Sequence, residues 1–320
     1  MIINCLQFVE HKKTMLKEKV NVLNKTFQIV PHIVIINTVD NPASASYIKN
    51  KVNLSKELGI QTTVIQFTES QYKLLKLIHS LNEDPSVHGI MVQLPLREDL
   101  SEETVLNSIN PNKDPDCLTN INKAHFYLAK HYHPFDIMPA TAKGVWELLK
   151  WVTKNQLTGK KVCLINRSEL VGKPLLHLLN FENCTVTMCH SKTENVYQYS
   201  RIADITVSAV GIPHFLDIND IQSNSIVIDV GINKLNEKIV GDTNFEELKH
   251  FCQITPVPKG VGPITVYELF NNLVSLIETQ LLKEHKLSDR IKTRHNTHHK
   301  PKTQHSHKRN VQHSHKSNQE

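Results

Sequence analysis

Tyr47 and Lys51 have the residue types and the spacing of a proton-transfer pair. They lie four positions apart in the segment SASYIKNK, whose pattern predicts a helix, so the phenol and the ammonium share one helix face. A lysine that is partly desolvated can have its pKa lowered toward neutrality, and it can then accept and donate protons. The same spacing is common on surface helices, where the tyrosine packs and the lysine is solvated, so other residues must support the assignment.

Gln93 and two aspartates are candidate ligand-binding residues, Gln93 at the edge of a predicted sheet and the aspartates in a loop. Gln93 ends the apolar run HGIMVQ, at the carboxyl end of a predicted strand, where open α/β sheets bind ligands. Its amide could bond the Lys51 amine or a substrate heterocycle, or it could cap a turn. Asp114 and Asp116 occupy alternate positions of the loop INPNKDPDC, so one of them can face a cleft. A carboxylate there suits the N–H and amino donors of a pterin edge; the alternative is a solvated acidic turn.

The second half of the chain contains a pattern suited to a phosphate-bearing cofactor. The segment LINRSELVGKPLLHLL predicts a strand, a loop and a helix, the arrangement in which N–H groups at a helix N-terminus bind phosphate. Arg167 and Ser168 offer a guanidinium and a hydroxyl at the strand end. The next strand ends in CHSKT, where His190, Ser191 and Lys192 replace the acidic residue that accepts the ribose 2′-hydroxyl of NAD. Such donors favour a 2′-phosphate and hence NADP, unless the turn is merely solvated.

Short β-branched runs alternate with helical patterns along the chain, as in βαβ units with parallel sheets. In the first half the predicted strands are residues 32–37, 62–67 and 88–94, and the predicted helices are 44–58 and 69–81. In the second half the predicted strands are 161–166, 184–189, 204–210, 225–231 and 253–257, followed by a helix over about 265–282. The second set consists of continuous apolar runs, which predicts helices on both faces of the sheet. We therefore expect the α/β fold class, with two α/β domains of which the second is a Rossmann-like parallel sheet.

The chain ends in a basic, histidine-rich tail. Residues 286–320 contain almost no large apolar side chains, so burial cannot offset the entropy of ordering, and we expect the tail to be disordered. Residues 290–320 carry a net charge of +7 against +6 for the whole chain, which leaves residues 1–289 nearly neutral at −1. The tail could hold nucleic acid by its charge, or a metal by its two His-x-His pairs, but neither property bears on the chemistry of the body.

The composition argues against several other classes of protein. No window offers about 18 or more uncharged apolar residues, and the first residues, MIINCLQFVEHKK, lack the basic region and the cleavage site of a signal peptide. We therefore expect a cytoplasmic protein without a membrane span. The six cysteines lie at scattered spacings without a CxxC pair, which indicates neither a disulfide framework nor a zinc site.

Nine segments of the chain, in the same order, resemble the signature segments of bifunctional methylenetetrahydrofolate dehydrogenase/methenyltetrahydrofolate cyclohydrolases. The segments are PASASYIKNK, HGIMVQLPL, INPNKDPD, NRSELVGKP, TVTMCHSKT, ADITVSAVGIP, VIDVGIN, GDTNF and ITPVPKGVGPITV. They cover roughly residues 30–280, and nine matches in order are far more specific than any single one. Short-chain dehydrogenases also use a tyrosine and a lysine at this spacing, but there the pair follows the nucleotide-binding half, whereas here it precedes it.

The resemblance implies two α/β domains that flank a cleft, usually in a homodimer, with NADP as the cofactor and tetrahydrofolate derivatives as ligands. The implied reactions belong to one-carbon metabolism and purine biosynthesis. They are the oxidation of 5,10-methylenetetrahydrofolate to 5,10-methenyltetrahydrofolate and the hydrolysis of that product to 10-formyltetrahydrofolate, without a metal. Lys51 would transfer protons, and Tyr47 and Gln93 would orient it and tune its pKa. Asp116 would hold the pterin. The implied NADP contacts are Asn166, Arg167, Ser168, Ser191 and Ile232, with Gly211 and Thr255 close to the nicotinamide.

The expected domain organisation combines the patterns with the resemblance. We expect a catalytic, folate-binding domain over residues 1–141 and an NADP-binding Rossmann-like domain over residues 142–264. A helix over residues 265–285 would pack back on the first domain, ahead of the tail over residues 286–320.

The chain departs from the family pattern at several positions. Glycine is usual where it has Val39, Cys117, Asn166 and Lys259, and PCTP-like residues are usual at positions 139–142, where it has PATA. A residue other than glycine in a backbone conformation that favours glycine costs about 1–3 kcal/mol of local strain. A long cation at Lys259 could bind the glutamate tail of a folate or obstruct turnover. These departures motivate a second hypothesis, a non-catalytic or monofunctional descendant that binds folate or NADP.

Overall fold

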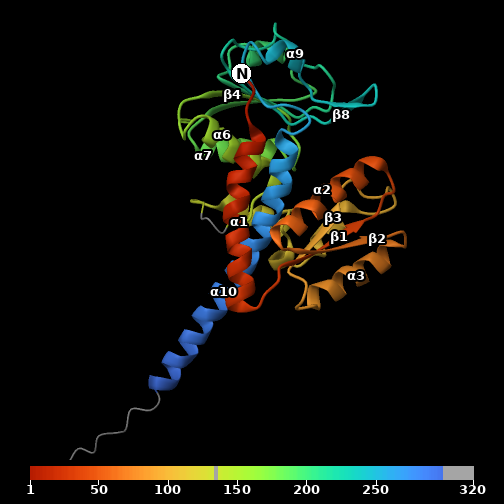
Figure 1. Ribbon diagram of the computed structural model, residues 1–320, viewed down its shortest axis with the longest axis vertical. Helices are drawn as coiled ribbons and strands as arrows, with labels where there is room; N and C mark the ends of the chain where they lie inside the picture. Colours follow the sequence, from red (N-terminus) through yellow and green to blue (C-terminus); the bar gives the residue numbers. More distant parts are fainter. Residues whose placement is uncertain (133–135, 298–320) are drawn as a thin grey trace, which may run out of the picture. The chain divides into compact units, whose positions relative to one another are not determined.

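The computed structural model of the protein describes residues 1–132 and 136–297. Met1–Gln280 form one compact unit that contains two separate parallel β-sheets and the helices packed on them (Figure 1). This arrangement confirms the expected α/β fold class and the expected division into two sheets.

The sheet of the first half has three parallel strands in the order β2-β1-β3. Its strands are β1 (His32–Asn37), β2 (Gln61–Gln66) and β3 (Gly89–Gln93), and the accompanying helices are α2 (Pro42–Leu58), α3 (Gln71–Glu83), α4 (Glu102–Asn107), η1 (Pro111–Lys113) and α5 (Asn120–Leu128). The side chain of Asn41 caps the start of α2 by accepting a hydrogen bond from the Ser44 N–H. Gly59, with a φ of 76°, ends the helix. Capping at both ends holds the helix that carries Lys51.

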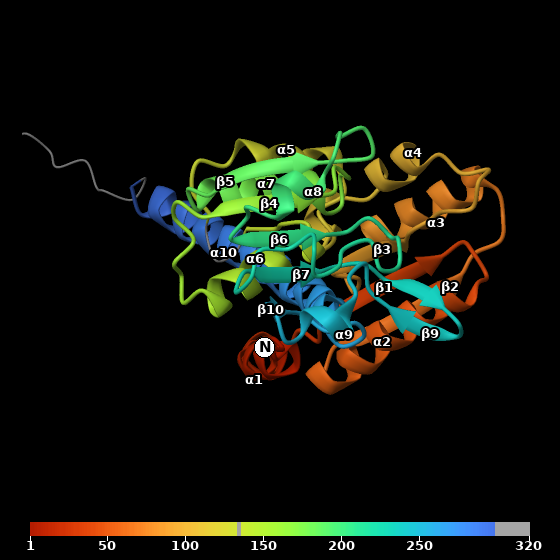
Figure 2. The same ribbon diagram turned by 90° about the horizontal axis from the view of Figure 1, so that it is seen from above.

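The second sheet has five parallel strands in the order β10-β7-β6-β4-β5, which follow one another across Figure 2. The strands are β4 (Lys161–Ile165), β5 (Thr185–Cys189), β6 (Ile205–Ser208), β7 (Ile226–Asp229) and β10 (Gln253–Ile254). The other elements are α6 (Ala140–Val152), α7 (Gly172–Phe181), α8 (Tyr197–Ser200), α9 (Phe245–Leu248) and the hairpin of β8 (Asn233–Leu235) and β9 (Lys238–Val240). Because the sheet strands are parallel, their carboxyl ends meet at one edge, where the predicted cofactor residues follow.

Two long helices lie side by side outside the sheets (Figure 1). The helix α1 (Cys5–Phe27) has no counterpart among the elements predicted above, although its buried residues recur at helical spacing with only Lys13 interrupting the apolar stripe. The helix α10 (Val261–Thr297) pairs with it through Lys19 and Glu278, whose Nζ and Oε2 are 2.9 Å apart.

The helix α10 extends beyond the predicted helix over residues 265–282. Residues 286–297, whose composition predicts disorder, continue it in the structure. Extending an existing helix requires no new nucleation, so a segment with few apolar residues can still be helical when it follows a packed one. The remaining tail, residues 298–320, lies outside the described residues.

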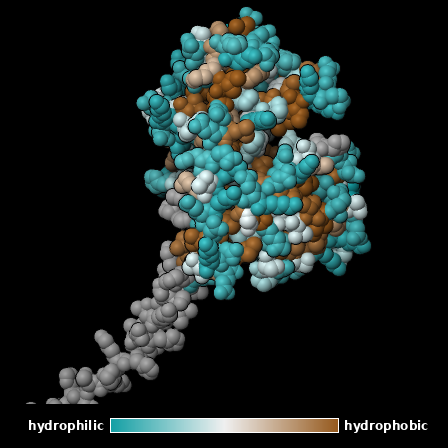
Figure 3. Space-filling model, in the orientation of Figure 1, coloured by the Kyte–Doolittle hydropathy of each residue, from teal (hydrophilic) through white to brown (hydrophobic). Residues whose placement is uncertain are grey.

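The surface and the thiols agree with the composition. Hydrophilic side chains cover much of the face in Figure 3, and apolar ones gather in patches between them. In the part of the chain that the structure describes, no helix is both long and apolar enough to span a membrane. Each of the six cysteines is a buried, free thiol.

Candidate active site

The predicted pair of Lys51 and Gln93 forms in the structure. Lys51 projects from α2, only 7% exposed, and its Nζ donates a hydrogen bond of 2.7 Å to Oε1 of Gln93, the last residue of β3. The Gln93 Nε2 donates at 2.8 Å to the carbonyl of Leu94. Because the backbone takes the amide nitrogen, the amide oxygen is the atom that faces the lysine. Two segments that are 42 residues apart therefore build one buried polar contact.

Burial lowers the pKa of Lys51 below its usual value, because a charged ammonium is disfavoured away from water. The negative charge of Asp116 opposes this shift, since it favours the ammonium. The net effect is a larger neutral fraction than an exposed lysine has. A neutral amine is the form that can accept a proton from water, so the environment suits Lys51 to act as a general base.

Of the two candidate aspartates, Asp114 is committed to the protein itself. Its carboxylate accepts hydrogen bonds from the N–H groups of Leu118 and Thr119 and from the Asn122 side chain, at 3.2, 2.9 and 3.0 Å. Asp116 is partly buried beside Lys51, and burial raises its pKa to about 6 while Lys51 opposes the shift. Asp116 is thus the aspartate that remains for a ligand.

Tyr47 lies one helical turn before Lys51, at the exposed edge of the cluster. Its side chain is 36% exposed, and partial burial raises its pKa, so the phenol stays protonated and can donate a hydrogen bond. The hydrogen bond that Lys51 donates goes to Gln93 and not to Tyr47. An orienting role of Tyr47 toward Lys51 remains a prediction.

Asn37 is a site-forming residue that the sequence reasoning missed. It ends β1 and pairs in register with Gln93 of β3 and Gln66 of β2. Its Nδ2 donates to the Val39 carbonyl at 2.7 Å and to Gln66 Oε1 at 2.9 Å. These bonds hold the start of the segment that leads to α2. The available signal was a polar residue closing the apolar run HIVIIN.

Asn166 shapes the loop between β4 and α7. Its Oδ1 accepts from the N–H groups of Ser168 and Gly172, at 2.8 and 3.0 Å, and its Nδ2 donates to the Ala209 carbonyl at 2.6 Å. These bonds engage both the oxygen and the nitrogen of the amide. The predicted NADP residue Asn166 therefore acts through the loop that it folds, and its side chain explains why asparagine serves where glycine is usual.

The same loop packs closely against the start of α7. A Cβ on Gly172 would stand 2.2 Å from the Asn166 carbonyl oxygen, so only glycine lets the loop approach the start of α7 this closely. Arg167 and Ser168 are exposed beside it. A guanidinium, a hydroxyl and a helix N-terminus together fit the phosphates of a dinucleotide.

The turn after β5 lies next to this loop. Ile165 at the end of β4 pairs in register with Cys189 at the end of β5, so the two connections leave the sheet side by side. The turn is closed by the Lys192 N–H, which donates to His190 Nδ1 at 3.1 Å, and it leaves Ser191 exposed. Arg167 and Ser191 therefore lie at the same part of the edge.

The remaining predicted cofactor residues follow the other strands. Gly211, with a φ of 72°, follows β6, and Ile232, 46% exposed, follows β7. Thr255 follows β10 but is 0% exposed, and its hydroxyl accepts from the Asp229 N–H at 2.8 Å. This geometry leaves Thr255 no exposed atom for a ligand, and its contribution is to join β10 to β7.

The sequence reasoning also missed Asp242, which organises the Gly211 turn. Its buried carboxylate accepts from the N–H groups of Val210, Gly211 and Ile212, at 2.7, 3.0 and 3.2 Å. A Cβ on Gly231 would stand 2.0 Å from Asp242 Oδ1, so the turn after β7 also packs closely against the Asp242 carboxylate. The signal was the acidic residue in GDTNF, a segment that was matched but given no role.

A hollow of about 830 Å³ lies elsewhere, lined by residues of α1 and α6 such as Phe8, Glu147 and Trp151. It contains none of the predicted site residues. Size alone does not make it the active site, because the polar groups suited to chemistry lie at the two sheet edges.

Two segments of the chain match the sequence profiles of one family. Residues 3–116 match the tetrahydrofolate dehydrogenase/cyclohydrolase catalytic domain, and residues 139–281 match the NAD(P)-binding domain of the same family. The chain belongs to the tetrahydrofolate dehydrogenase/cyclohydrolase family. The resemblance stated from the sequence is thereby confirmed. A bifunctional protein FolD from Lactobacillus acidophilus is 43% identical over 268 residues, which are 83% of this chain and 93% of the relative.

Solved structures of the family share the whole fold. The bifunctional methylenetetrahydrofolate dehydrogenase/cyclohydrolase FolD of Campylobacter jejuni superposes with a TM-score of 0.82 at 37% identity, over 88% of this chain and 99% of that one. The Trypanosoma brucei enzyme, solved with NADP and an inhibitor, has a TM-score of 0.83 at 29% identity, over 88% and 98% of the two chains.

Two positions where tetrahydrofolate dehydrogenase/cyclohydrolases usually have glycine carry backbone strain in this member. Cys117 has a φ of 59° and Lys259 a φ of 75°, in the left-handed region that favours glycine. Each costs about 1–3 kcal/mol. Cys117 is buried, and its thiol donates to the Ile137 carbonyl at 3.5 Å, whereas Lys259 is exposed. The strain at Cys117 thus coincides with a contact that glycine could not make.

Proposed function

We propose that this protein oxidises 5,10-methylenetetrahydrofolate to 5,10-methenyltetrahydrofolate with NADP, and hydrolyses the product to 10-formyltetrahydrofolate, in one-carbon metabolism. The Campylobacter jejuni relative is a methylenetetrahydrofolate dehydrogenase/cyclohydrolase by name, which covers both kinds of activity. The observation that carries the proposal is the buried hydrogen bond between Lys51 and Gln93 next to Asp116. These residues supply a proton acceptor and a carboxylate for the pterin in one place.

The proposed hydrolysis uses Lys51 twice. The neutral amine accepts a proton from the attacking water as the oxygen bonds to the methenyl carbon. The resulting ammonium then returns the proton to the departing ring nitrogen as the carbon–nitrogen bond breaks, and the hydroxyl proton leaves to solvent as the formyl group forms. Gln93 can serve both forms of the lysine, because its oxygen accepts a hydrogen bond from an amine or an ammonium.

The oxidation depends mainly on alignment of two bound molecules, since the substrate supplies its own electrophilic carbon. NADP, when bound, supplies the acceptor for the hydride. Arg167, Ser168 and Ser191 would hold its phosphates, with Gly211 and Ile232 toward the nicotinamide. His190, Ser191 and Lys192, rather than an acidic residue, directly follow β5, which supports NADP rather than NAD.

Replacing Arg167 with alanine is expected to raise the KM for NADP about tenfold or more, since a hydrogen bond to a charged group is worth about 1.5–3 kcal/mol. The KM for methylenetetrahydrofolate should change less than about twofold. Steady-state kinetics with each substrate varied would measure both values. Arg201→Ala, which removes an arginine bonded to Asp220 in the same half, is the control. Equal increases for both substrates would contradict the assignment of Arg167 to phosphate.

The decisive assay follows NADPH formation and methenyl loss together in one sample of purified protein. Production of NADPH followed by consumption of the methenyl product is the expected result. The absence of NADPH formation with NADP, and of NADH formation with NAD, would exclude the dehydrogenase activity.

The strain at Cys117 and Lys259 supports a second candidate, a binder that retains folate or NADP affinity without one or both activities. This second candidate predicts that the protein binds folate without turnover. It also predicts that Lys51→Met leaves the affinity for folate unchanged. The coupled assay therefore separates the two candidates.

We propose further that the protein is a cytoplasmic homodimer, as the family resemblance implies. Its mass in solution, measured by light scattering, should be twice that of the chain. A monomer with full activity would exclude a need for the dimer.

Removing residues 290–320 is expected to leave both activities within about twofold of the intact chain, because the site residues all lie before Leu281. The coupled assay on the shortened protein tests this. A collapse of activity would show that the tail contributes to the folate chemistry rather than to nucleic acid or metal binding.

A further inference from the structure

The loop that carries Asp116 is held on both sides of that residue. On one side, the carbonyl of Pro115 accepts a 2.9 Å hydrogen bond from Nδ2 of Asn272, which belongs to α10. On the other side, the Cys117 thiol donates to the Ile137 carbonyl. Asp116 itself therefore sits between two anchored neighbours.

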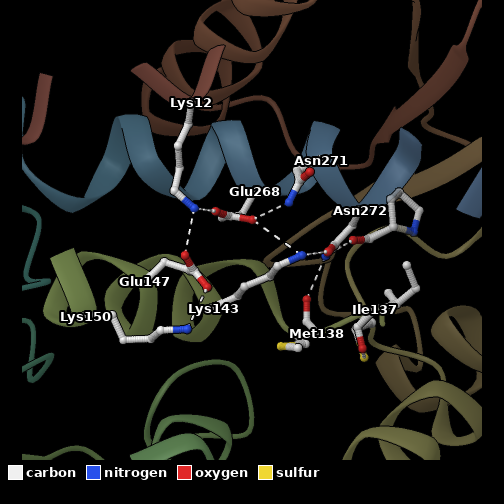
Figure 4. A network of polar contacts seen from close by, with 11 residues as sticks. Lys12, Ile137, Met138, Lys143, Glu147, Lys150, Glu268, Asn271 and Asn272 are labelled. Carbon is white, nitrogen blue, oxygen red and sulfur yellow. Dashed lines mark hydrogen bonds and ion pairs between the residues drawn. The ribbon is translucent and has the colours of Figure 1, made fainter. Parts of the chain in front are cut away.

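Asn272 ties this loop to a second segment. Its Nδ2 also donates to the carbonyl of Met138 at 2.7 Å, so a single amide group joins the Asp116 loop to the chain that leads into α6 (Figure 4). The side chain is 0% exposed. A buried amide that loses such bonds leaves unpaired carbonyls, which costs about 1–3 kcal/mol for each group.

Lys143 fixes which way the Asn272 amide faces. Its Nζ donates at 2.8 Å to Asn272 Oδ1, so the oxygen is held by the ammonium and both Nδ2 hydrogens point to the two carbonyls. If the Asn272 amide were rotated by 180°, its oxygen would face the two backbone carbonyl oxygens. Its NH₂ group would then face the ammonium of Lys143. The charge on Lys143 thus selects one of the two amide orientations.

The positive charge of Lys143 is in turn paired with a carboxylate inside the protein. Its Nζ lies 3.5 Å from Oε2 of Glu268, which is 0% exposed, and the other carboxylate oxygen lies 3.8 Å from Nζ of Lys12. Figure 4 shows this chain of polar groups running from Lys12 through Glu268 and Lys143 to Asn272 and Met138. A buried charge pair adds little net stability, so a role in placing other groups accounts better for its presence.

We propose that Asn272, oriented by Lys143, is a positioning residue that fixes Asp116 in the folate site. This inference rests on the proposed function, because it takes Asp116 as the residue that holds the pterin. It adds two residues that the sequence patterns did not single out. They act through the backbone of Pro115 and touch neither substrate nor cofactor.

Displacing Asp116 would have two consequences. The pterin would lose a well-placed carboxylate, so folate binding would weaken while NADP binding, which uses the other sheet, would not. The negative charge near Lys51 would also move away, and the pKa of Lys51 would fall further because that charge favours the ammonium.

The test is Asn272→Asp, which keeps the side-chain shape and the acceptor for Lys143 but removes both donors. Asn21→Asp is the matched control, since it makes the same change at an exposed position of α1, outside this network of polar contacts. We expect Asn272→Asp to raise the KM for methylenetetrahydrofolate at least tenfold over the control, with the KM for NADP within twofold. The rising limb of the cyclohydrolase pH profile should move to lower pH, as in Asp116→Asn.

A KM for folate within twofold of the control, or equal increases for both substrates, would overturn the inference, as would an unshifted pH profile. If Asn272→Asp fails to bind NADP and is therefore unfolded, Asn272→Ala, which adds no charge, is judged by the same criteria. Failure of the proposed function looks different, because the intact protein and the control would then be inactive too. In that case the folate affinity of the variant against the control still decides the role of Asn272.

Discussion

Lys51→Met is expected to slow the hydrolysis of 5,10-methenyltetrahydrofolate by a factor of about 10²–10⁴, the usual contribution of a positioned general base. Methionine fills the buried space without a titratable group, so the change isolates the loss of the proton acceptor. Hydride transfer depends mainly on alignment, and the dehydrogenase rate should fall much less. The loss of methenyl absorbance measures the rate of hydrolysis, and NADPH formation in a separate assay measures the dehydrogenase rate.

Lys49→Met is the control for this change. Lys49 is exposed on the same helix, so its replacement alters the charge of α2 by the same amount without touching the buried cluster. Its hydrolysis rate should stay within about twofold of the unchanged protein. Hydrolysis by Lys51→Met at nearly the control rate would exclude Lys51 as the base.

Asp116→Asn is expected to weaken the binding of folate substrates by a factor of about ten to one hundred. A charged hydrogen bond is worth about 1.5–3 kcal/mol, and each 1.4 kcal/mol corresponds to a tenfold change. The affinity for NADP should not change. Titration of each ligand into the protein measures both affinities, and Asp99→Asn, which alters an exposed aspartate paired with Arg97, is the control. Unchanged folate affinity would remove Asp116 from the site.

The pH dependence distinguishes the two roles of Asp116. Its pKa is raised to about 6, so in the unchanged protein folate binding should weaken as the pH falls through about 6 and the carboxylate is protonated. This transition should vanish in Asp116→Asn. The asparagine variant also lacks the charge that raises the pKa of Lys51, so the neutral base persists to lower pH and the rising limb of hydrolysis should shift downward. A shift to higher pH would contradict this electrostatic coupling.

Local patterns were sufficient for most of the elements and for part of the site. The strand over residues 32–37 was predicted with the bounds it has in β1, because a short continuous apolar run between polar residues is typical of a buried strand. The spacing of Tyr47 and Lys51 required them to share a helix face. The helix α1 escaped prediction although its buried residues recur at helical spacing, and the hairpin of β8 and β9 escaped it because each of its strands has only three residues.

The roles of individual side chains depended on partners remote in the chain. Residue type and spacing did not distinguish Asp114, which bonds to its own loop, from Asp116, which lies beside Lys51; only the family resemblance singled out Asp116. Thr255 stands at the expected sheet edge, yet its burial against Asp229 is visible only once β7 and β10 are paired.

The sequence alone determined the fold class, the family and the identity of the residues able to move protons, because periodicity and residue type are local properties. Tertiary structure decided which of those residues meet and what each one faces. The amide of Asn272 reaches Pro115 across 157 positions of the chain, a contact that no spacing predicts. Burial and the charges of neighbours, which set the protonation of Lys51 and Asp116, arise only when distant segments exclude water together.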